Sequence, residues 1–348
     1  NLLKTVHKGA FVISLRSFQG GFEYSNYEGV VSPAYQVFYP TVDVEDGYYK
    51  YLFKDTSFIE KMNSYTMSLR DGKNIAFADF GRTYIPVPPV CEQKRIADFL
   101  DSKCAEIDVL SADIQSEIDT LETYKRSIIT ETVTKGLNKN VPMKDSGIEW
   151  AEKVPAHWGI KQNKYIMKKI KHICPVFNGE DILSLTMNGV IVRDLDAGGK
   201  MPSSFNGYQR VYPGNLLMCL FDYDVTPRCI GLIKNEGITS PAYSQFVMKD
   251  GNSAEYYYYY YLMIDFTKEL LHLAKNMRHS FTEDQLGVIN APVPPVNEQI
   301  TIAKYLDKQC TEIEAIISQK QKQLEILANY KKSLIFEYVT GKKEVPNG

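Results

Sequence analysis

The sequence predicts an α+β protein in which two mixed α/β domains are separated by a pair of long, antiparallel coiled-coil helices. One observation is an internal repeat: Pro-Val-Pro-Pro-Val at residues 86–90 returns at residues 292–296, an offset of 206 residues. Another is the stretch from Glu92 to Thr134, which has no proline or glycine and indicates one long helix. Short apolar runs broken by glycine, proline and asparagine precede each repeat and are typical of strands and loops.

The repeat extends well beyond the proline-rich run. Downstream matches at the same offset include Ile96/Ile302, Leu100/Leu306, Cys104/Cys310, Tyr124/Tyr330 and Lys125/Lys331. Upstream, Glu28-Gly29 and Ser32-Pro33-Ala34-Tyr35 return as Glu236-Gly237 and Ser240-Pro241-Ala242-Tyr243 at an offset of 208 residues. If the two long helices pack antiparallel, a pseudo-twofold axis relates the two halves of the chain.

We therefore expect four segments in the chain. These are a first mixed domain at residues 1–85, a first helical spacer at 86–144, a second mixed domain at 145–291 and a second helical spacer at 292–348. The mixed domains are unequal, because far more residues separate Asp145 from Ser240 than precede Ser32. We expect the first mixed domain to be N-terminally truncated.

The long helices carry the residue spacing of a coiled coil. Apolar side chains recur at alternating steps of three and four residues, which places them along one face of a helix. We expect polar interruptions at Glu117 in the first helix and at Lys320 and Gln323 in the second. The expected seam residues are Ile107, Leu110, Ile114, Leu121, Tyr124 and Ile128 in the first copy and Ile313, Ile316, Leu327, Tyr330 and Leu334 in the second.

Composition and motifs exclude several classes of protein. The formal net charge is −2, so the chain has no general basic excess for phosphate binding. No run of about 18 apolar residues occurs, so we expect no membrane-spanning helix. The six cysteines lack metal-ligand spacing, which favours reduced thiols in a cytoplasmic protein. Glycine-rich phosphate loops, His-Glu-x-x-His and the Asn/Asp-Pro-Pro-aromatic signature of adenine methyltransferases are missing, which argues against an enzyme.

The repeated run resembles the specificity subunit of type I restriction–modification enzymes. Both copies read Pro-Val-Pro-Pro-Val-x-Glu-Gln and lead into a heptad helix that ends in Tyr-Lys-x-Ser. The resemblance also includes Asp-Ser-Gly-Ile-Glu-Trp at 145–150, Val-Pro-Ala-His-Trp at 154–158 and Leu-Arg-Ser-Phe-Gln-Gly-Gly at 15–21. With both Ser-Pro-Ala-Tyr blocks, it covers essentially the whole chain.

The resemblance implies DNA recognition without catalysis. Each mixed domain is then a target-recognition domain that reads one half of a split site in double-stranded DNA, and the helices set the spacer between the half-sites. Two modification (methyltransferase) subunits are implied to dock on the helices, with restriction (nuclease–translocase) subunits added to them. S-adenosylmethionine, ATP and Mg²⁺ would belong to those partners, with no cofactor on this chain. The alternative is a coiled-coil scaffold that pairs proteins without binding DNA.

Candidate DNA-binding residues are basic or amide side chains. Arginine can bind guanine O6 and N7 together, and Arg70 and Arg278 occupy equivalent places in the repeat. Arg16 and Gln19 lie beside two glycines that let the backbone come close to a ligand. The densest lysine cluster follows Trp158 and suggests phosphate contacts, with a solvated surface as the alternative. The full set is Arg16, Gln19, Arg70, Lys73, Lys168, Lys169, Arg228, Lys275 and Arg278.

The candidate partner-binding residues are duplicated, since Tyr124 and Lys125 return as Tyr330 and Lys331. We expect both tyrosines to cap the helix seam, with contact to a partner subunit as the alternative. The tyrosine run at 256–261 is interpreted as core packing with some surface rings, because six consecutive rings must point all round a helix.

Overall fold

The computed structural model describes residues 3–14, 22–64, 80–196, 202–274 and 279–346. The chain divides into two compact units. Unit 1 combines Asn1–Ile118 with Ile317–Gly348, and unit 2 is Asp119–Ile316. Each unit therefore contains one mixed region together with part of each long helix. The predicted domain ranges divide the chain differently, since they assign the helices to segments of their own, and they stay a prediction.

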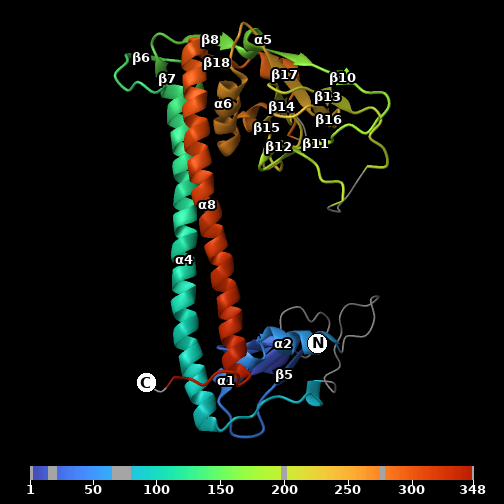
Figure 1. Cartoon of the computed structure of the whole chain (residues 1–348), viewed down its shortest axis with the longest axis vertical. Coiled ribbons are helices and arrows are strands. Elements are labelled where there is room, and N and C mark those ends of the chain that lie inside the picture. Colours follow the sequence, from blue (N-terminus) through green and yellow to red (C-terminus); the bar gives the residue numbers. More distant parts are fainter. Residues whose placement is uncertain (1–2, 15–21, 65–79, 197–201, 275–278, 347–348) are drawn as a thin grey trace. The chain divides into compact units, whose positions relative to one another are not determined.

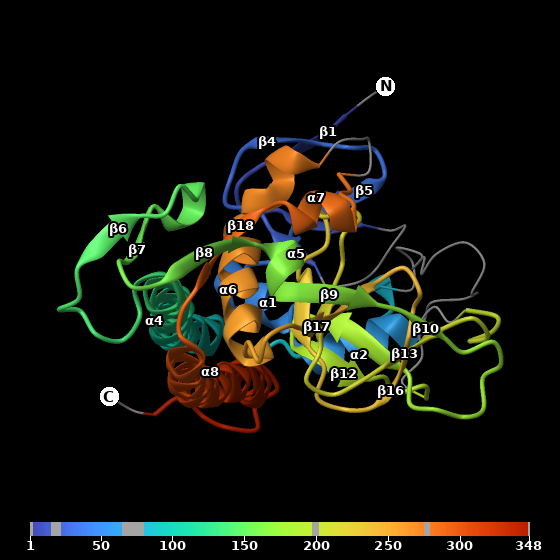
Figure 2. The same ribbon diagram turned by 90° about the horizontal axis from the view of Figure 1, so that it is seen from above.

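Two long helices are shared by the units (Figures 1 and 2): α4 (Val90–Lys135) and α8 (Val296–Val339). They are antiparallel, because in unit 1 Lys331 pairs with Asp108 whereas Lys320, earlier in α8, pairs with Glu117, later in α4. The predicted fold class, mixed regions with a long antiparallel helix pair, is confirmed.

The seam between the helices is offset by one residue from part of the predicted pattern. Leu110, Tyr124, Ile316 and Tyr330 were expected in it, but each is more than 40% exposed. Within residues 107–128 of α4 the buried and half-buried positions are Ile107, Ser111, Ile114, Ile118, Leu121, Lys125 and Ile128. Within residues 313–334 of α8 they are Ile313, Ile317, Lys320, Leu324, Leu327, Lys331 and Leu334. This seam keeps the steps of three and four residues but includes one serine and three lysines. The expected seam positions at Leu110, Tyr124, Ile316 and Tyr330 are therefore wrong, as are the polar breaks at Glu117 and Gln323, whereas Lys320 is correctly placed.

A buried glutamine ties the start of each long helix to the mixed region beside it. The Gln93 amide donates to the Pro88 carbonyl at 2.7 Å and accepts from the Glu45 backbone N–H at 2.9 Å. In unit 2 the Gln299 amide makes the same pair of contacts, donating to Pro294 and accepting from the Ser253 N–H. These bonds satisfy backbone groups that the proline-rich run and the helix starts would otherwise leave unpaired.

Unit 1 places two small sheets and two short helices against its part of the helix pair. The sheets have the strand orders β1–β4 and β3–β2–β5. Phe53, which follows α1, contacts Phe11 and Phe22 with ring centroids 5.1 and 5.2 Å away, so aromatic packing forms the centre of this core. The elements are β1 (Lys4–Val6), β2 (Phe11–Ser14), β3 (Glu23–Tyr24), β4 (Gly29–Val31), β5 (Tyr35–Phe38), α1 (Asp46–Leu52) and α2 (Thr56–Ser64).

Unit 2 has more strands around a larger core. Its main sheets have the orders β15–β14–β17–β9 and β10–β13–β16, and β18 pairs with β8. Its elements before β13 are β6 (Met143–Asp145), η1 (Glu149–Ala151), β7 (Lys153–Pro155), β8 (Gly159–Gln162), α5 (Asn163–Ile166), β9 (Met167–Ile170), β10 (His172–Ile173), β11 (Leu183–Thr186) and β12 (Gly189–Val192). The rest are β13 (Gln209–Val211), β14 (Leu216–Met218), β15 (Ile230–Leu232), β16 (Gly237–Thr239), β17 (Ser244–Met248), α6 (Ala254–Thr267), η2 (Glu269–Leu273), α7 (Glu283–Gly287) and β18 (Asn290–Val293).

The strand registers repeat between the units. Phe11 lies opposite Phe38 in the β2–β5 pair, and Leu216 lies opposite Phe246 in the β14–β17 pair. In unit 2 the leading strands β9 and β10 extend these sheets by pairing with β17 and β13. Among the described residues of unit 1, no strand takes the place of β9 or β10. The truncation of the first mixed domain nevertheless stays a prediction.

In the part of the chain that the structure describes, no helix is long and apolar enough to cross a membrane.

Candidate nucleic-acid interface

Each mixed region is fixed to the helix pair by a tyrosine that completes a helix end. In unit 1 the Tyr48 hydroxyl donates to the Val339 carbonyl at 2.7 Å, and in unit 2 the Tyr256 hydroxyl donates to the Val133 carbonyl at 2.9 Å. Both carbonyls lie in the last turn of a long helix, where no later amide of the helix can pair with them. The two bonds are equivalent in the repeat, so the same device holds both mixed regions.

A second tyrosine of each short helix binds an aspartate of the long helix beside it. The Tyr51 hydroxyl donates to Asp101 at 2.6 Å, and the Tyr259 hydroxyl donates to Asp307 at 2.7 Å. Burial, reinforced by these aspartates, raises the pKa of both hydroxyls, which therefore stay protonated donors. Within the tyrosine run at 256–261, every ring except that of Tyr258 is buried. The main role of the run is therefore core packing and anchoring.

The lysines of β9 line an open groove in unit 2. The groove has a volume of about 430 Å³ and runs between β9 and α7. The Lys168 side chain is exposed and has no hydrogen bond or ion pair with any described residue, so its ammonium group is available to an external anion. The basic residues around the groove are Lys164, Lys168, Lys169 and Lys249, and its acidic residues are Glu283 and Asp284.

Lys169 differs from its neighbour because it forms an ion pair with Glu283. The Glu283 carboxylate also accepts from the Ser244 hydroxyl at 2.8 Å. Burial alone would raise the pKa of Glu283, but the bonds from Lys169, from its own backbone amide and from Ser244 outweigh burial and lower that pKa. Lys169 therefore joins β9 to α7, and contact with phosphate would have to compete with this pair.

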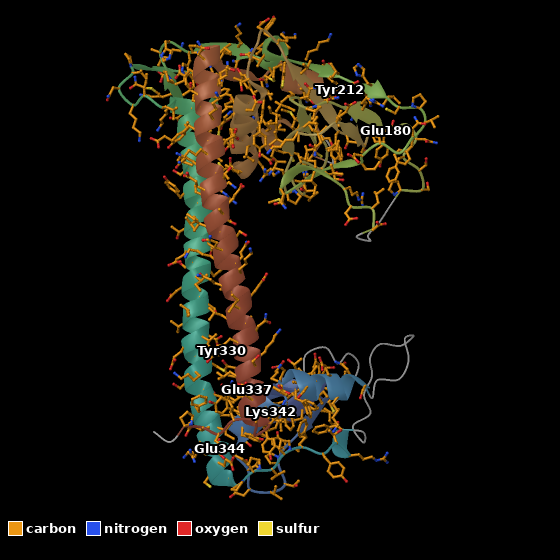
Figure 3. The ribbon with its side chains drawn as sticks, viewed as in Figure 1. Glu180, Tyr212, Tyr330, Glu337, Lys342 and Glu344 are labelled. Carbon is orange, nitrogen blue, oxygen red and sulfur yellow. The ribbon has the colours of Figure 1, made fainter. Side chains whose placement is uncertain are left out.

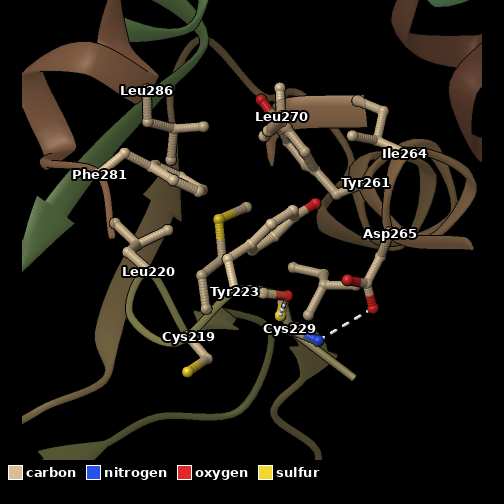
Figure 4. A pocket seen from close by; sticks show the side chains of 12 residues that line it. Cys219, Leu220, Tyr223, Cys229, Tyr261, Ile264, Asp265, Leu270, Phe281 and Leu286 are labelled. Atoms are coloured by element: carbon tan, nitrogen blue, oxygen red, sulfur yellow. Dashed lines mark hydrogen bonds between the residues drawn. The ribbon is translucent and has the colours of Figure 1, made fainter. Parts of the chain in front are cut away.

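Arg228 lies in the loop that joins β14 to β15. Its guanidinium donates to the Tyr258 hydroxyl at 3.3 Å and is half-buried there. The base of this loop is held by Asp265, which accepts from the Cys229 N–H at 2.9 Å (Figure 4), and by Lys268, which donates to the Thr226 carbonyl at 2.7 Å. The loop is thus fixed at its base by the end of α6.

The cavity beneath this loop is too small for a nucleotide (Figure 4). Its volume is about 20 Å³, whereas ligand pockets measure roughly 300–1,000 Å³. The Tyr261 hydroxyl in its wall is buried and has no hydrogen-bond partner among the described residues. Beside it, the neighbouring Cys229 thiol lowers the pKa of Cys219, against the opposing effect of burial. The cavity belongs to the core under the loop.

One arginine missed by the sequence analysis joins three segments of unit 2. The Arg210 guanidinium on β13 lies 3.2 Å from the carboxylates of both Glu180 and Glu236. Two residues later in the chain, the Tyr212 hydroxyl is 3.0 Å from His172 Nδ1. Glu180 and Tyr212 are labelled in Figure 3. Both contacts join segments far apart in the sequence, so no local sequence signal could have identified them.

Six of the predicted DNA-binding residues lie outside the described residues. They are Arg16, Gln19, Arg70, Lys73, Lys275 and Arg278. Of the remaining three, Lys168 and Lys169 are adjacent on β9, and Arg228 is in the loop before β15. The groove lining includes the two lysines but not Arg228.

The predicted partner-binding residues divide by side-chain type. Tyr124 and Tyr330 are 52% and 54% exposed, so neither caps the seam as expected (Figure 3 labels Tyr330). Lys125 pairs with Glu314 at 2.5 Å and Lys331 pairs with Asp108 at 2.6 Å, each across the helix pair. The tyrosines offer an external surface, whereas the lysines hold the helices together.

Among the described residues, no group of three histidine, cysteine, aspartate or glutamate side chains is placed to hold a metal ion.

Comparison with known structures supports the fold. One chain, from a study of complex assembly and conformational transition of the type I R-M system, has a TM-score of 0.72 at 13% identity; the match covers 97% of this chain and 83% of that one. The HsdS subunit from Thermoanaerobacter tengcongensis has a TM-score of 0.49 at 14% identity, with coverage of 98% and 83%. Of these two, the first likeness shows a shared fold. The comparison with curated proteins finds no match.

A family model gives the strongest relationship. The model described as the type I restriction modification DNA specificity domain matches residues 3–120 and 230–326, which is more than half of the chain. The function of that family is DNA recognition, and its role is not catalytic, which decides against the scaffold alternative. The chain therefore belongs to the type I restriction–modification DNA specificity family and is a specificity subunit.

Proposed function

We propose that each mixed region reads one half of a bipartite site in double-stranded DNA, and that α4 and α8 set the spacer between the half-sites. The observation that carries this proposal is duplicated anchoring combined with different sequences at equivalent positions of the two mixed regions. Repeat-equivalent bonds from Tyr48 and Tyr256 hold both mixed regions. The sequence of the 221–229 loop, however, differs in chemistry from the sequence of residues 15–21, to which it corresponds in the repeat. A reader of two different half-sites needs this combination.

Within unit 2, Lys168 is the best-supported phosphate contact, because its ammonium group is exposed beside the groove and has no partner among the described residues. Arg228 is the candidate base-reading residue of the 221–229 loop, with its guanidinium oriented by Tyr258. Arg16, Gln19, Arg70, Lys73, Lys169, Lys275 and Arg278 complete the proposed set.

The exposed tyrosines Tyr124 and Tyr330, with Lys125 and Lys331 beside them, are proposed to dock two modification subunits. Restriction subunits would join through these, and S-adenosylmethionine, ATP and Mg²⁺ would be bound by the partners. Tyr124→Ala/Tyr330→Ala should reduce co-purification of the modification subunit while leaving the melting temperature unchanged, because both rings are exposed. Unchanged co-purification would refute this docking surface.

Methylome sequencing tests the proposed function. Cells that carry the modification subunit are compared with and without this gene. A methylated motif with two specific halves and a fixed spacer should disappear when the gene is deleted. A methylome that does not change would exclude the proposed function.

A further inference from the structure

Two of the three described ion pairs across the helix seam are copies of each other. Lys125 of α4 pairs with Glu314 of α8, and Lys331 of α8 pairs with Asp108 of α4. The 206-residue offset converts Lys125 into Lys331 and Asp108 into Glu314. Each pair lies inside one unit, and each lysine occupies a seam position where its side chain is at most 30% exposed.

The third ion pair has no copy. Lys320 of α8 pairs with Glu117 of α4 in unit 1. At the equivalent places, 206 residues away, the chain has Ile114 in α4 and Gln323 in α8. Lys320 is also a seam residue, with a side chain only 24% exposed, so its charge requires a partner there.

The duplicated contacts cannot determine which helix is the partner. If α4 paired in the same way with α4 of a second copy, Lys125 of each copy would pair with Asp108 of the other, because Asp108 is the equivalent of Glu314. The two helices would then share two Lys125–Asp108 ion pairs. The bond from Tyr48 to Val339 would be replaced by an equivalent bond to Val133 of the second copy. These contacts are therefore satisfied equally well when α4 pairs with α8 and when α4 pairs with α4 of a second copy.

The Lys320–Glu117 pair does distinguish the partners. In a pairing of α4 with α4, Glu117 of each copy would face Ile114 of the other. In a pairing of α8 with α8, Lys320 of each copy would face Gln323 of the other. Each arrangement leaves two like charges without an opposite charge, and in the α8 pairing the two Lys320 charges lie at the seam itself. A single polar contact in a coiled coil fixes partner and register in this way, at a cost in stability.

We propose that the Lys320–Glu117 ion pair is the contact that selects pairing of α4 with α8 over pairing of like helices from two copies of this chain. The inference concerns assembly and does not depend on DNA binding. It predicts that apolar residues at the two positions will weaken the selection without weakening the seam.

The test uses the full chain, refolded from denaturant at several concentrations and analysed by sedimentation velocity and native mass spectrometry. Wild-type protein should have the monomer mass of 39.7 kDa. Glu117→Leu/Lys320→Leu should melt at an equal or higher temperature, because leucine fills the seam position of Lys320 well and Glu117 lies at the edge of the seam. The dimer-to-monomer ratio of this variant should nevertheless rise on the order of tenfold.

Two matched variants complete the test. Lys125→Leu/Glu314→Leu removes a duplicated pair and should stay monomeric, as should the charge exchange Glu117→Lys/Lys320→Glu, which restores the pair with reversed sign. If the Glu117/Lys320 leucine variant is as monomeric as wild type, the proposal is overturned. It is equally overturned if the Lys125/Glu314 control forms as much dimer. Because the readout is mass, this result is independent of the methylome experiment.

Discussion

At the scale of single residues, the hydroxyls of Tyr48 and Tyr256 complete the ends of the long helices. We predict that Tyr256→Phe lowers the free energy of unfolding by about 1–3 kcal/mol, because the buried Val133 carbonyl loses its hydrogen-bond donor. Urea denaturation monitored by circular dichroism measures the change. Tyr165→Phe is the control, since that ring is 56% exposed. Equal stability of both variants would contradict the capping role of Tyr256.

The adjacent lysines of β9 should respond differently to truncation. Lys168→Ala should weaken DNA binding about equally for all sequences and reduce the salt dependence of binding by roughly one counterion, because one phosphate contact is lost. Lys169→Ala should instead lower stability, because Glu283 loses its ion-pair partner. Fluorescence anisotropy at several salt concentrations, together with thermal melting, separates the two effects. The assignment fails if Lys168→Ala leaves the salt dependence unchanged.

The composition of the β9 segment was visible in the sequence, but the partners of its side chains were not. Lys168 and Lys169 were predicted together as phosphate contacts because both belong to one lysine cluster. Only the fold places Glu283, 114 residues away, against Lys169. Arg228 was predicted in the same way, and its contact with Tyr258 depends on the packing of α6 under the loop.

At the scale of elements, the two helices end at glycines that differ in their surroundings. Gly136 and Gly341 both have positive φ, at +73° and +71°. A Cβ on Gly136 would lie 2.9 Å from Glu298 Oε1 and 3.2 Å from Trp158 Cζ2, whereas a Cβ on Gly341 would meet nothing within 4 Å. Gly341→Ala should therefore cost about 1 kcal/mol of stability from backbone strain alone. Gly136→Ala should cost more, and chemical denaturation of both variants checks this order.

The helices themselves could be predicted from the sequence, but the exact seam could not. The absence of proline and glycine and the glycine ends correctly predicted α4, and the repeat predicted α8. Apolar spacing favoured Leu110 and Tyr124 over Ser111 and Lys125. The real seam accepts a lysine at 125 because Glu314 compensates its charge from the other helix. A contact of this kind is invisible in the pattern of one helix.

At the scale of the whole molecule, the ionised carboxylates should make the chain sensitive to acid. The pKa of Glu283 and that of Asp101 are both lowered, because bonds from lysine and hydroxyl partners outweigh burial. A lowered folded-state pKa gives stability that is present above the unfolded value and is lost as the pH falls through the folded value. The pKa of Asp46 is raised by burial and by Glu45, so Asp46 acts in the opposite direction.

We therefore predict that the free energy of unfolding falls between pH 6 and about pH 3. Urea titrations across this range measure it. Glu283→Gln should make the dependence less steep, because one carboxylate no longer titrates. A free energy of unfolding that stays constant to pH 3 would rule out this contribution.

The repeat gave the architecture of the chain in advance, including two mixed regions with equivalent attachment to the helices. It could not give the larger number of strands in unit 2, because β9 and β10 have no matching segment in the first copy. The sequence also did not reveal the ion pair that breaks the symmetry. In the sequence, Lys320 and Glu117 are only polar interruptions of an apolar heptad pattern, and the antiparallel packing of the two helices brings them together.

The bond from Tyr48 to Val339 also determines the order in which the chain can be completed during synthesis. It joins residues 291 positions apart, and unit 1 is built from both ends of the chain. Unit 2 is one continuous segment, Asp119–Ile316, and can close as soon as that segment has been made. The mixed region synthesised first is therefore finished last, because the Tyr48 hydroxyl has no Val339 carbonyl to bind until the final residues of α8 have been made.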